Sequence, residues 1–221
     1  MTFRAAGTSL SGQSQTDGIL VDTLKNWKHF EIIEKGAHVK TQPGVIAGKI
    51  NESLVKYCRK LGPDPASINA CTAGGITANN SSGMSSGITK NPYHTVKSIS
   101  FVLPDGTYID SSQNEADEIL KRNCPHIYNG LLDIRKKIFS SRTLKERIVK
   151  KYMIKNTTGY SLNSFLDYEN PADILMHLMI GSEGTLGFIS EIVFKTFPLK
   201  NEKLTGLLFF RNIHAAAESL S

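Results

Sequence analysis

Three segments rich in glycine and small polar residues have the composition that binding a phosphate-bearing ligand requires. They span residues 7–14, 71–83 and 181–187. Glycine lets a backbone approach a ligand closely, and the free peptide N–H groups then contact it. Each segment alone is ambiguous. Three of them around one αβ chain predict a single extended ligand touched by several loops, and a dinucleotide fits that description.

The first segment nearly matches G-x-x-x-x-G-K-[ST], the pattern of loops that bind nucleoside triphosphates. Gln13 stands where that pattern has lysine, so the β- and γ-phosphates would lack their cation, and we exclude an ATPase or GTPase. Turns at Gly7 and Gly12, hydroxyls between them and the nearby Arg4 suit a pyrophosphate better. By itself the pattern also describes a serine-rich surface turn.

The composition is that of a soluble globular protein, with 40% hydrophobic and 21% charged residues in 221. We expect no membrane-spanning segment, since no stretch approaches the roughly 20 apolar residues that one needs. The amino terminus lacks the apolar core of a signal peptide. Cys58, Cys71 and Cys124 fit neither a disulfide framework nor a zinc site, so we expect no metal and a reducing, cytoplasmic location.

Positive charge is concentrated in one stretch of the chain. The formal net charge is +6, and much of the excess lies between Arg135 and Lys155. A solvated helical face is the simplest interpretation; nucleic acid, anionic lipid or an acidic partner domain is the functional one. Phe139 and Tyr152 are the only aromatic residues there, which argues against stacking on bases.

Hydrophobic periodicity and turn residues predict a fold that mixes helices and strands. One predicted helix has a buried stripe at Ile46, Ile50, Leu54 and Cys58 and ends at Gly62-Pro63. Residues 63–92 have a linker-like composition, but their position between regular elements favours a functional loop. Strands are expected at 19–22 (buried), 30–35, 37–41, 96–103, 107–110, 188–197 and 204–210, and helices at 115–151 (two or three), 172–179 and from 213.

The three segments, in their order and spacing, resemble the vanillyl-alcohol-oxidase/p-cresol-methylhydroxylase flavoprotein superfamily. Residues 4–12 resemble its pyrophosphate loop. Residues 63–65 together with 71–83 resemble its second FAD-contacting segment, and residues 181–189 its third. The resemblance extends along nearly the whole chain. It implies an α+β fold, the FAD-binding PCMH-type domain of two αβ subdomains.

Within this superfamily the D-lactate dehydrogenase and glycolate oxidase subgroup is the most similar. Residues 155–160 and 172–175 resemble large bacterial members that join an FAD module to a carboxy-terminal iron–sulfur module. The resemblance implies a flavin-dependent enzyme that oxidises a D-2-hydroxy acid, of D-lactate or glycolate type, by hydride transfer to flavin N5. The electron acceptor stays open. Iron–sulfur clusters are expected only in a module beyond Ser221.

The resemblance also implies which residues contact the cofactor. Some members attach FAD through a histidine in the first loop; Ala5 and Ala6 occupy that loop here, so we expect non-covalent FAD. Cys71, His94 and His177 are expected to be structural. The residues predicted to bind FAD are Arg4, Ala5, Ala6, Gly7, Thr8, Ser9, Ser11, Gly12, Pro43, Gly44, Pro65, Gly74, Gly75, Asn80, Gly83, Glu183, Gly184 and Ile189.

The same comparison predicts the domain organisation. Residues 1–200 would form the FAD-binding domain, lacking its first βαβ element, and residues 201–221 the start of a truncated substrate-binding cap. The residues that bind and deprotonate the hydroxy acid lie on that cap in relatives, so we expect no catalytic residue in this chain and no substrate turnover by it alone. We expect a cytoplasmic protein, with peripheral contact at the inner membrane face as an option.

Two other functions remain as alternatives. One is a nicotinamide-dependent flavoprotein reductase of the same fold acting on a sugar nucleotide, which residues 63–65 and 155–160 disfavour. The other is a non-catalytic module that binds RNA or an anionic membrane through residues 135–155. Nucleic acid is the less favoured partner, because aromatic residues are sparse in that stretch.

Overall fold

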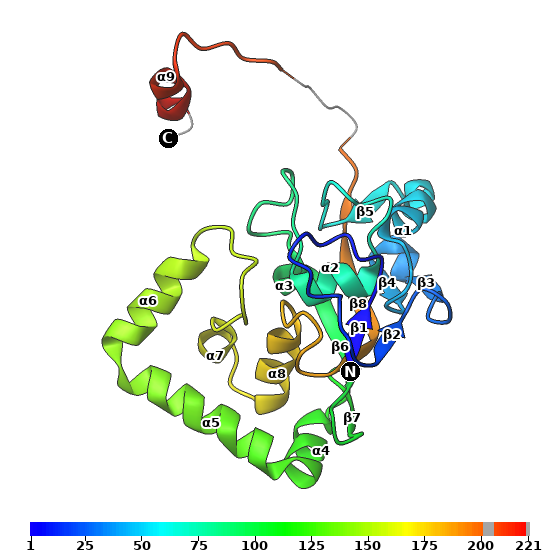
Figure 1. Cartoon of the computed structure of the whole chain (residues 1–221), viewed down its shortest axis with the longest axis vertical. Coiled ribbons are helices and arrows are strands. Elements are labelled where there is room, and N and C mark those ends of the chain that lie inside the picture. Colours follow the sequence, from blue (N-terminus) through cyan, green and yellow to red (C-terminus); the bar gives the residue numbers. More distant parts are fainter. Residues whose placement is uncertain (201–205, 220–221) are drawn as a thin grey trace.

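The computed structural model describes residues 1–200 and 206–219. They form a mixed α+β fold, as the sequence predicted, with a small parallel sheet, a larger antiparallel sheet and a group of helices beside it (Figure 1). The strands are β1 (Thr2–Arg4), β2 (Leu20–Asp22), β3 (Phe30–Ile33), β4 (His38–Thr41), β5 (Arg59–Leu61), β6 (Val96–Val102), β7 (Tyr108–Asp110) and β8 (Phe188–Pro198). The α-helices are α1 (Ala47–Leu54), α2 (Ala73–Asn79), α3 (Pro92–Thr95), α4 (Ala116–Asn123), α5 (Pro125–Ser140), α6 (Arg142–Tyr152), α7 (Ser164–Asp167), α8 (Pro171–Met179) and α9 (Ile213–Glu218).

Strand β8 is the centre of the larger sheet. It pairs antiparallel with β4, β5 and β6, and the sheet order is β3-β4-β8-β6-β7 with β5 beside the far end of β8. Ile192, Phe194 and Thr196 are buried at alternate positions of β8 while Lys195 is exposed, as a strand with one covered face requires. Because β8 begins directly after the third glycine-rich segment, this strand fixes the position of that segment.

The smaller sheet holds the first glycine-rich loop in place. Strands β1 and β2 pair in parallel, with Thr2 opposite Leu20, and residues 5–19 connect them. The centroid of the Phe3 ring on β1 lies 5.1 Å from that of Phe188 at the start of β8. The ring of Trp27 lies at the same distance from Phe188. These aromatic contacts anchor the small sheet beside the third segment.

Helices α4, α5 and α7 pack around α8, whose residues from Pro171 to Met179 are nearly all buried. This explains why the apolar run predicted at 172–179 forms a helix without a polar face. Helices α5 and α6 run along the outer edge of the molecule (Figure 1). Of the helical residues of α6, only Ile148 is buried. The three helices α4, α5 and α6 confirm the prediction for residues 115–151.

The stripe predicted through Cys58 is right for its first part and wrong for its last. Ile50 and Leu54 are fully buried on α1, but the helix ends at Leu54. Cys58 adopts a left-handed backbone conformation with φ of 54° and is exposed. The chain turns there because β5 pairs with the end of β8, where Leu61 lies opposite Thr196. Pairing between distant strands thus outweighs the local helical pattern, because that pattern contains no information about distant partners.

Two further predictions need correction. A strand does form at 20–22, but it is not buried, since Ile19 and Leu20 are 65% and 44% exposed. The strand predicted at 204–210 is absent over 206–210, and positions 204 and 205 lie outside the described residues. No described strand pairs with 206–210, and a strand needs a partner for its backbone groups. Helix α9 does begin at Ile213, as predicted.

The long loop predicted at 63–92 contains more regular structure than expected, because α2 and the start of α3 lie within or next to it. The side chain of Thr72 caps α2 by accepting a hydrogen bond from the Gly75 N–H. None of the helices among the described residues combines the length and the apolar character that crossing a bilayer requires.

Phe194 offers a test of this architecture, because it is almost completely buried on the central strand. We expect Phe194→Ala to lower the free energy of unfolding by about 3–5 kcal/mol, since the substitution leaves a cavity in the core. The neighbouring exposed Lys195 serves as control, and Lys195→Ala should change stability by less than about 0.5 kcal/mol. Chemical denaturation measures both, and equal losses would contradict the central placement of β8.

Candidate functional site

A cavity of about 320 Å³ lies where the three glycine-rich segments meet. That volume is within the range of small-molecule and cofactor sites. Segments that are far apart in the sequence contribute its wall. The lining residues are Phe3, Ala5, Ala6, Gly7, Thr8, Ser9, Gln13, Ser14, Thr23, Pro43, Pro65, Ser67, Cys71, Thr72, Gly74, Gly75, Ile76, Ala78, Asn79, Ser81, Ser82, Lys155, Thr157, Glu183, Gly184, Gly187, Phe188 and Ile189.

The second segment reaches the cavity because its backbone packs directly against the Pro43 turn. The Gly74 N–H donates a hydrogen bond of 2.9 Å to the Pro43 carbonyl. A Cβ at Gly74 would lie 2.4 Å from the Cβ of Pro43, which no rotamer relieves. Helix α2 therefore begins where it does only because this position has no side chain.

Asp64 holds the far end of the second segment. Its carboxylate accepts hydrogen bonds from the backbone N–H groups of Ser85 and Ser86, at 3.3 and 3.1 Å. Burial by itself raises the pKa of Asp64, but the hydrogen bonds from both serines outweigh burial and leave that pKa below its ordinary value. Gly83 packs against the Asp64 backbone so closely that a Cβ would lie 1.9 Å from its carbonyl oxygen. The Pro63-Asp64-Pro65 stretch thus fastens the turn at 83–86.

The third segment is hydrogen-bonded to the backbone of α2. Gly181 donates to the Thr77 carbonyl at 3.1 Å, and Glu183 donates to the Ala78 carbonyl at 2.9 Å. The Glu183 carboxylate accepts a hydrogen bond from the Asn79 side chain. Glu183 itself has a positive φ of 54°, an uncommon conformation for a residue other than glycine. These contacts tie the second and third segments into one wall of the cavity.

The structure brings most of the predicted binding residues together. Those that line the cavity are Ala5, Ala6, Gly7, Thr8, Ser9, Pro43, Pro65, Gly74, Gly75, Glu183, Gly184 and Ile189; those that do not are Arg4, Ser11, Gly12, Gly44, Asn80 and Gly83.

Four of the predicted residues outside the lining have visible structural roles. Gly44 packs against the Thr23 carbonyl, where a Cβ would lie 2.2 Å away, and Gly83 packs against Asp64. Asn80 ends α2 in a left-handed conformation, and its side chain accepts the Tyr93 N–H at 3.1 Å. The Arg4 guanidinium lies behind Gly7, whose Cβ would be 3.2 Å from Nε.

Several lining residues were missed by the reasoning from sequence. Lys155 and Thr157 belong to the loop after α6, and Lys155 is the only cation among the described residues that line the cavity. The signal was present, since both lie in the stretch 155–160 that resembles other family members. Two buried side-chain atoms of the lining, Gln13 Oε1 and Ser82 Oγ, find no hydrogen-bond partner among the described residues. Such atoms are what a polar ligand would satisfy.

A cluster of aromatic and histidine side chains joins α3 to α8, and α3 in turn contacts α2. His177 on α8 stacks on Tyr168 at 3.8 Å and meets Tyr93 edge-on at 5.0 Å. The Tyr93 hydroxyl donates to the Asp167 carboxylate at 2.6 Å. Burial lowers the pKa of His177 to about 4, although a hydrogen bond to the Asp173 carbonyl opposes the shift. His177 is thus a neutral packing residue at pH 7.

Cys71 lies in the cavity wall but is not poised for chemistry. It is buried, and burial raises the pKa of its thiol, only partly offset by a hydrogen bond with Ser67. A thiol with a raised pKa is a poor nucleophile at neutral pH. Among the described residues, the cavity wall offers small side chains, peptide groups, hydroxyls, one carboxylate and one ammonium group, which suits binding more than acid–base catalysis.

Comparison with known proteins agrees with this geometry. A family model described as "FAD binding domain" matches residues 1–112. D-2-hydroxyglutarate dehydrogenase of Pantoea ananatis is 28% identical over 206 residues, which cover 90% of this chain and 20% of that protein. Glycolate oxidase subunit GlcD of Bacillus subtilis is 27% identical, with 99% of this chain and 36% of that protein covered. D-lactate dehydrogenase of Anaerostipes hadrus is 25% identical over 96% of this chain.

Among solved structures, alkyldihydroxyacetonephosphate synthase matches with a TM-score of 0.55 and 17% identity, over 91% of this chain and 30% of that one. A likeness at this identity concerns the fold alone. The chain spans about a fifth of the D-2-hydroxyglutarate dehydrogenase that it matches. These findings confirm the family predicted from the glycine-rich segments.

The depressed pKa of His177 predicts a pH dependence of stability. Its folded-state pKa of about 4 lies below the ordinary 6.5, so protonation favours the unfolded chain. The stability that the neutral His177 contributes is therefore present above pH 6.5 and is lost as the pH falls towards 4. Between pH 7 and pH 5 this single residue should remove about 2 kcal/mol from the free energy of unfolding.

Denaturation of wild type and His177→Phe at both pH values measures the effect. Phenylalanine keeps the stacking on Tyr168 and cannot titrate, so the variant should lose about 2 kcal/mol less than wild type over that interval. Because other groups titrate in both proteins, only the difference between them counts. Parallel pH profiles would show that the pKa of His177 is the same in the folded and the unfolded chain.

Proposed function

Because the chain belongs to the FAD binding domain family, we propose that it is the FAD-binding part of a flavin-dependent oxidoreductase that oxidises a D-2-hydroxy acid. The observation that carries this proposal is the cavity at the meeting point of the three glycine-rich segments. Named relatives acting on 2-hydroxy acids, matched along nearly the whole chain, support the reaction class. Bound FAD supplies the hydride acceptor, at flavin N5, while this chain binds and orients the cofactor.

The cavity has the properties that FAD requires. Its wall is built from peptide groups and small side chains, because the segments that form it are rich in Gly, Ala, Ser and Thr. Gln13 Oε1 and Ser82 Oγ, two buried atoms of lining residues, have no hydrogen-bond partner among the described residues, and a polar ligand would satisfy such atoms. The first loop contains no histidine or cysteine to which FAD could be attached covalently, so non-covalent FAD is part of the proposal.

The first loop is proposed to hold the FAD pyrophosphate. Residues 5–9 line the cavity with backbone groups and hydroxyls, and such groups bind phosphate oxygens. Arg4 lies behind Gly7 and adds positive charge from outside the cavity wall. Lys155 lines the cavity itself and is the group available to neutralise an anionic part of the ligand directly.

The remaining predicted residues form the proposed contact surface for the rest of the cofactor. Pro43, Pro65 and the second segment line one side of the cavity, and Glu183, Gly184 and Ile189 line another. Gly44, Asn80 and Gly83 act indirectly, since they fix turns that place the lining residues. Ser11 and Gly12 are exposed beyond the lining, and their contacts with FAD remain part of the proposal.

The substrate-binding half of the site is proposed to come from a further part of a longer protein. The chain covers only about a fifth to a third of the length of the matched relatives. We propose residues 1–200 as the FAD-binding domain and residues 201–221 as the start of a substrate-binding domain. Leu207, Leu208 and Phe209 are 79%, 75% and 86% exposed. Apolar side chains this exposed fit an element that packs against additional protein.

FAD binding is tested by the visible absorption spectrum of the purified chain after incubation with FAD and removal of free flavin. We expect the flavin spectrum to stay with the protein. Gly75→Leu should weaken binding at least about tenfold, since a longer side chain enters the cavity. A methyl at Gly75 would make only ordinary contacts, at 3.4 Å to Thr72 Oγ1 and 3.5 Å to Ala5 Cβ, so the fold should persist.

Gly130→Leu is the matched control, because Gly130 lies on α5 outside the lining and a Cβ there meets nothing within 4 Å. It should bind FAD like wild type. Equal affinity of Gly75→Leu and wild type would place FAD elsewhere. Failure of the folded wild-type chain to bind FAD at all would overturn the proposed role of this cavity.

Lys155 gives an independent test of the cavity's electrostatics. We expect Lys155→Gln to raise the Kd for FAD roughly tenfold, because a hydrogen bond to a charged group is worth about 1.5–3 kcal/mol. Lys151→Gln removes the same charge four residues earlier, on α6, and should leave the Kd unchanged, since Lys151 does not line the cavity. Fluorescence titration of FAD measures both, and equal effects of the two substitutions would contradict a direct contact.

A further inference from the structure

The arm formed by α5 and α6 carries all of the excess positive charge of the chain. Between Asp133 and Lys151 there are eight lysines and arginines and two acidic residues. This excess of six equals the formal net charge of +6 of the whole chain, so the remaining sequence is neutral overall. Positive charge concentrated on one part of the surface favours the binding of an anionic partner.

Helix α6 is open on most of its surface. It packs on α5, and Ile148 is its one buried helical residue. Its end is held by the Tyr152 hydroxyl, which donates to the Tyr160 carbonyl at 2.8 Å and accepts the Leu162 N–H at 2.9 Å. Among the described residues, therefore, α6 has a fixed position and an uncovered outer face.

Exposed aliphatic side chains lie among the cations of this face. Val149 and Met153 are one helical turn apart and are 54% and 67% exposed, and Ile154 is 70% exposed. Lys150 and Lys151 lie between them in the sequence and are also exposed. Lysines that surround exposed aliphatic residues at a helix end are typical of contact with a membrane interface.

The aromatic residues between Arg135 and Lys155 already have partners within the chain, which disfavours RNA. The Phe139 ring is covered by the Arg135 guanidinium at 4.4 Å and by the Lys145 ammonium at 4.7 Å. Tyr152 is half-buried and its hydroxyl is hydrogen-bonded. Binding of single-stranded RNA depends on free aromatic faces for stacking. An acidic protein would match the charges, but an anionic bilayer presents negative headgroups and an apolar layer together along its whole surface.

We propose that α6 and the turn at 153–154 dock this protein on an anionic lipid bilayer. Arg147, Lys150 and Lys151 attract the negative headgroups, and the aliphatic side chains of Val149, Met153 and Ile154 enter the interface. Lys155, the next residue, lines the cavity, so the docked protein holds its cavity beside the membrane. This inference goes beyond the proposed oxidoreductase function and does not depend on FAD binding.

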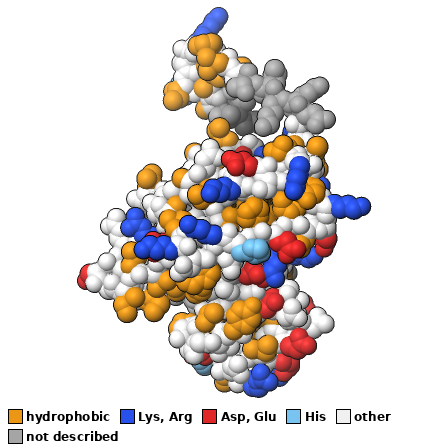
Figure 2. Space-filling view, turned by 90° about the vertical axis from the view of Figure 1, so that its right-hand side faces the viewer, with side chains coloured by type: hydrophobic (Ala, Val, Ile, Leu, Met, Phe, Trp, Pro, Cys, Tyr) orange, Lys and Arg blue, Asp and Glu red, His pale blue; other side chains and the backbone are white. Residues whose placement is uncertain are grey.

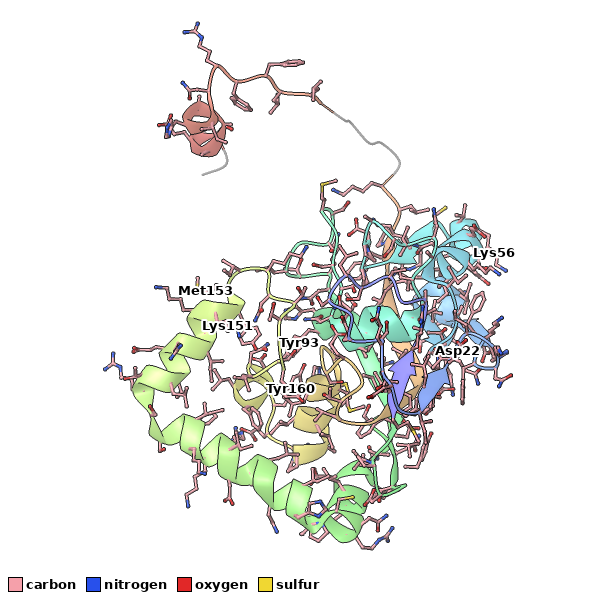
Figure 3. All side chains as sticks on the ribbon, viewed as in Figure 1. Asp22, Lys56, Tyr93, Lys151, Met153 and Tyr160 are labelled. Atoms are coloured by element: carbon pink, nitrogen blue, oxygen red, sulfur yellow. The ribbon has the colours of Figure 1, made fainter. Side chains whose placement is uncertain are left out.

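The molecule provides a matched control on its other side. Figure 3 shows Lys151 and Met153 together near the end of α6, and Lys56 on the opposite side of the molecule. On the side that carries α1 and β3, lysines and arginines are scattered among acidic and apolar side chains (Figure 2). Lys56 also lies over the ring of its neighbour Tyr57, as Lys151 does over Tyr152, so the two lysines have similar surroundings.

The test is cosedimentation of the full chain with vesicles of phosphatidylcholine, with and without phosphatidylglycerol. We expect binding only to the anionic vesicles and a decrease as salt is raised. Lys150→Gln with Lys151→Gln should weaken binding roughly 10- to 30-fold, and Met153→Asp should weaken it as well. Lys49→Gln with Lys56→Gln removes the same charge from the other side and should leave binding unchanged.

Three results would overturn the proposal. Equal weakening by the control pair would indicate a general attraction between a basic chain and a negative surface. If the Met153→Asp variant bound anionic vesicles as tightly as wild type, the aliphatic side chains would not enter the membrane interface. If the chain bound a homopolymeric RNA through Lys150 and Lys151 and did not bind vesicles, the arm would be a nucleic-acid site instead. Circular dichroism of each variant checks that the helices are intact.

Discussion

The cavity depends on close approach between backbones at positions that have no side chain. Gly74 packs on Pro43, and Gly83 packs on the carbonyl of Asp64. In both places a Cβ would come within 2.4 Å of another atom, so the second segment would have to move away from the Pro43 turn or the 63–65 stretch. Movement of that wall would change every contact that the wall offers a cofactor.

These contacts also explain how distant parts of the chain form one surface. Strand β8 pairs with β4, β5 and β6, and the third segment enters β8 directly. Phe188 at the start of β8 packs against Phe3, which precedes the first loop. The second segment is held by backbone hydrogen bonds to both Pro43 and Glu183. The larger sheet therefore positions the third segment, the small sheet that packs on Phe188 positions the first, and hydrogen bonds to Pro43 and Glu183 join the second segment to its neighbours.

The charges of the chain are separated in space according to what they do. The cavity wall holds one ammonium group, Lys155, and one carboxylate, Glu183, among the described residues, and the carboxylate is hydrogen-bonded to Asn79. The positive excess lies instead on α5 and α6, next to the cavity but outside it.

The sequence by itself determined the type of ligand, most of the elements and the family. Glycine-rich segments, alternating apolar residues in β6 and β8, and the helical periodicity of α5 and α6 are local patterns, and local sterics and burial are sufficient to produce them. Twelve of the predicted contact residues line one cavity, although the sequence contains no direct record of their distance from one another.

Only the tertiary structure decided where those elements end and which residues meet. Cys58 leaves the predicted helix because β5 pairs with β8. Residues 206–210 have the pattern of a strand and do not form one, since no described strand pairs with them. Lys155 reaches the cavity only because α6 and its following turn place it there. In each case the outcome depends on whether residues far apart in the chain meet in the fold, and a local pattern carries no information about that.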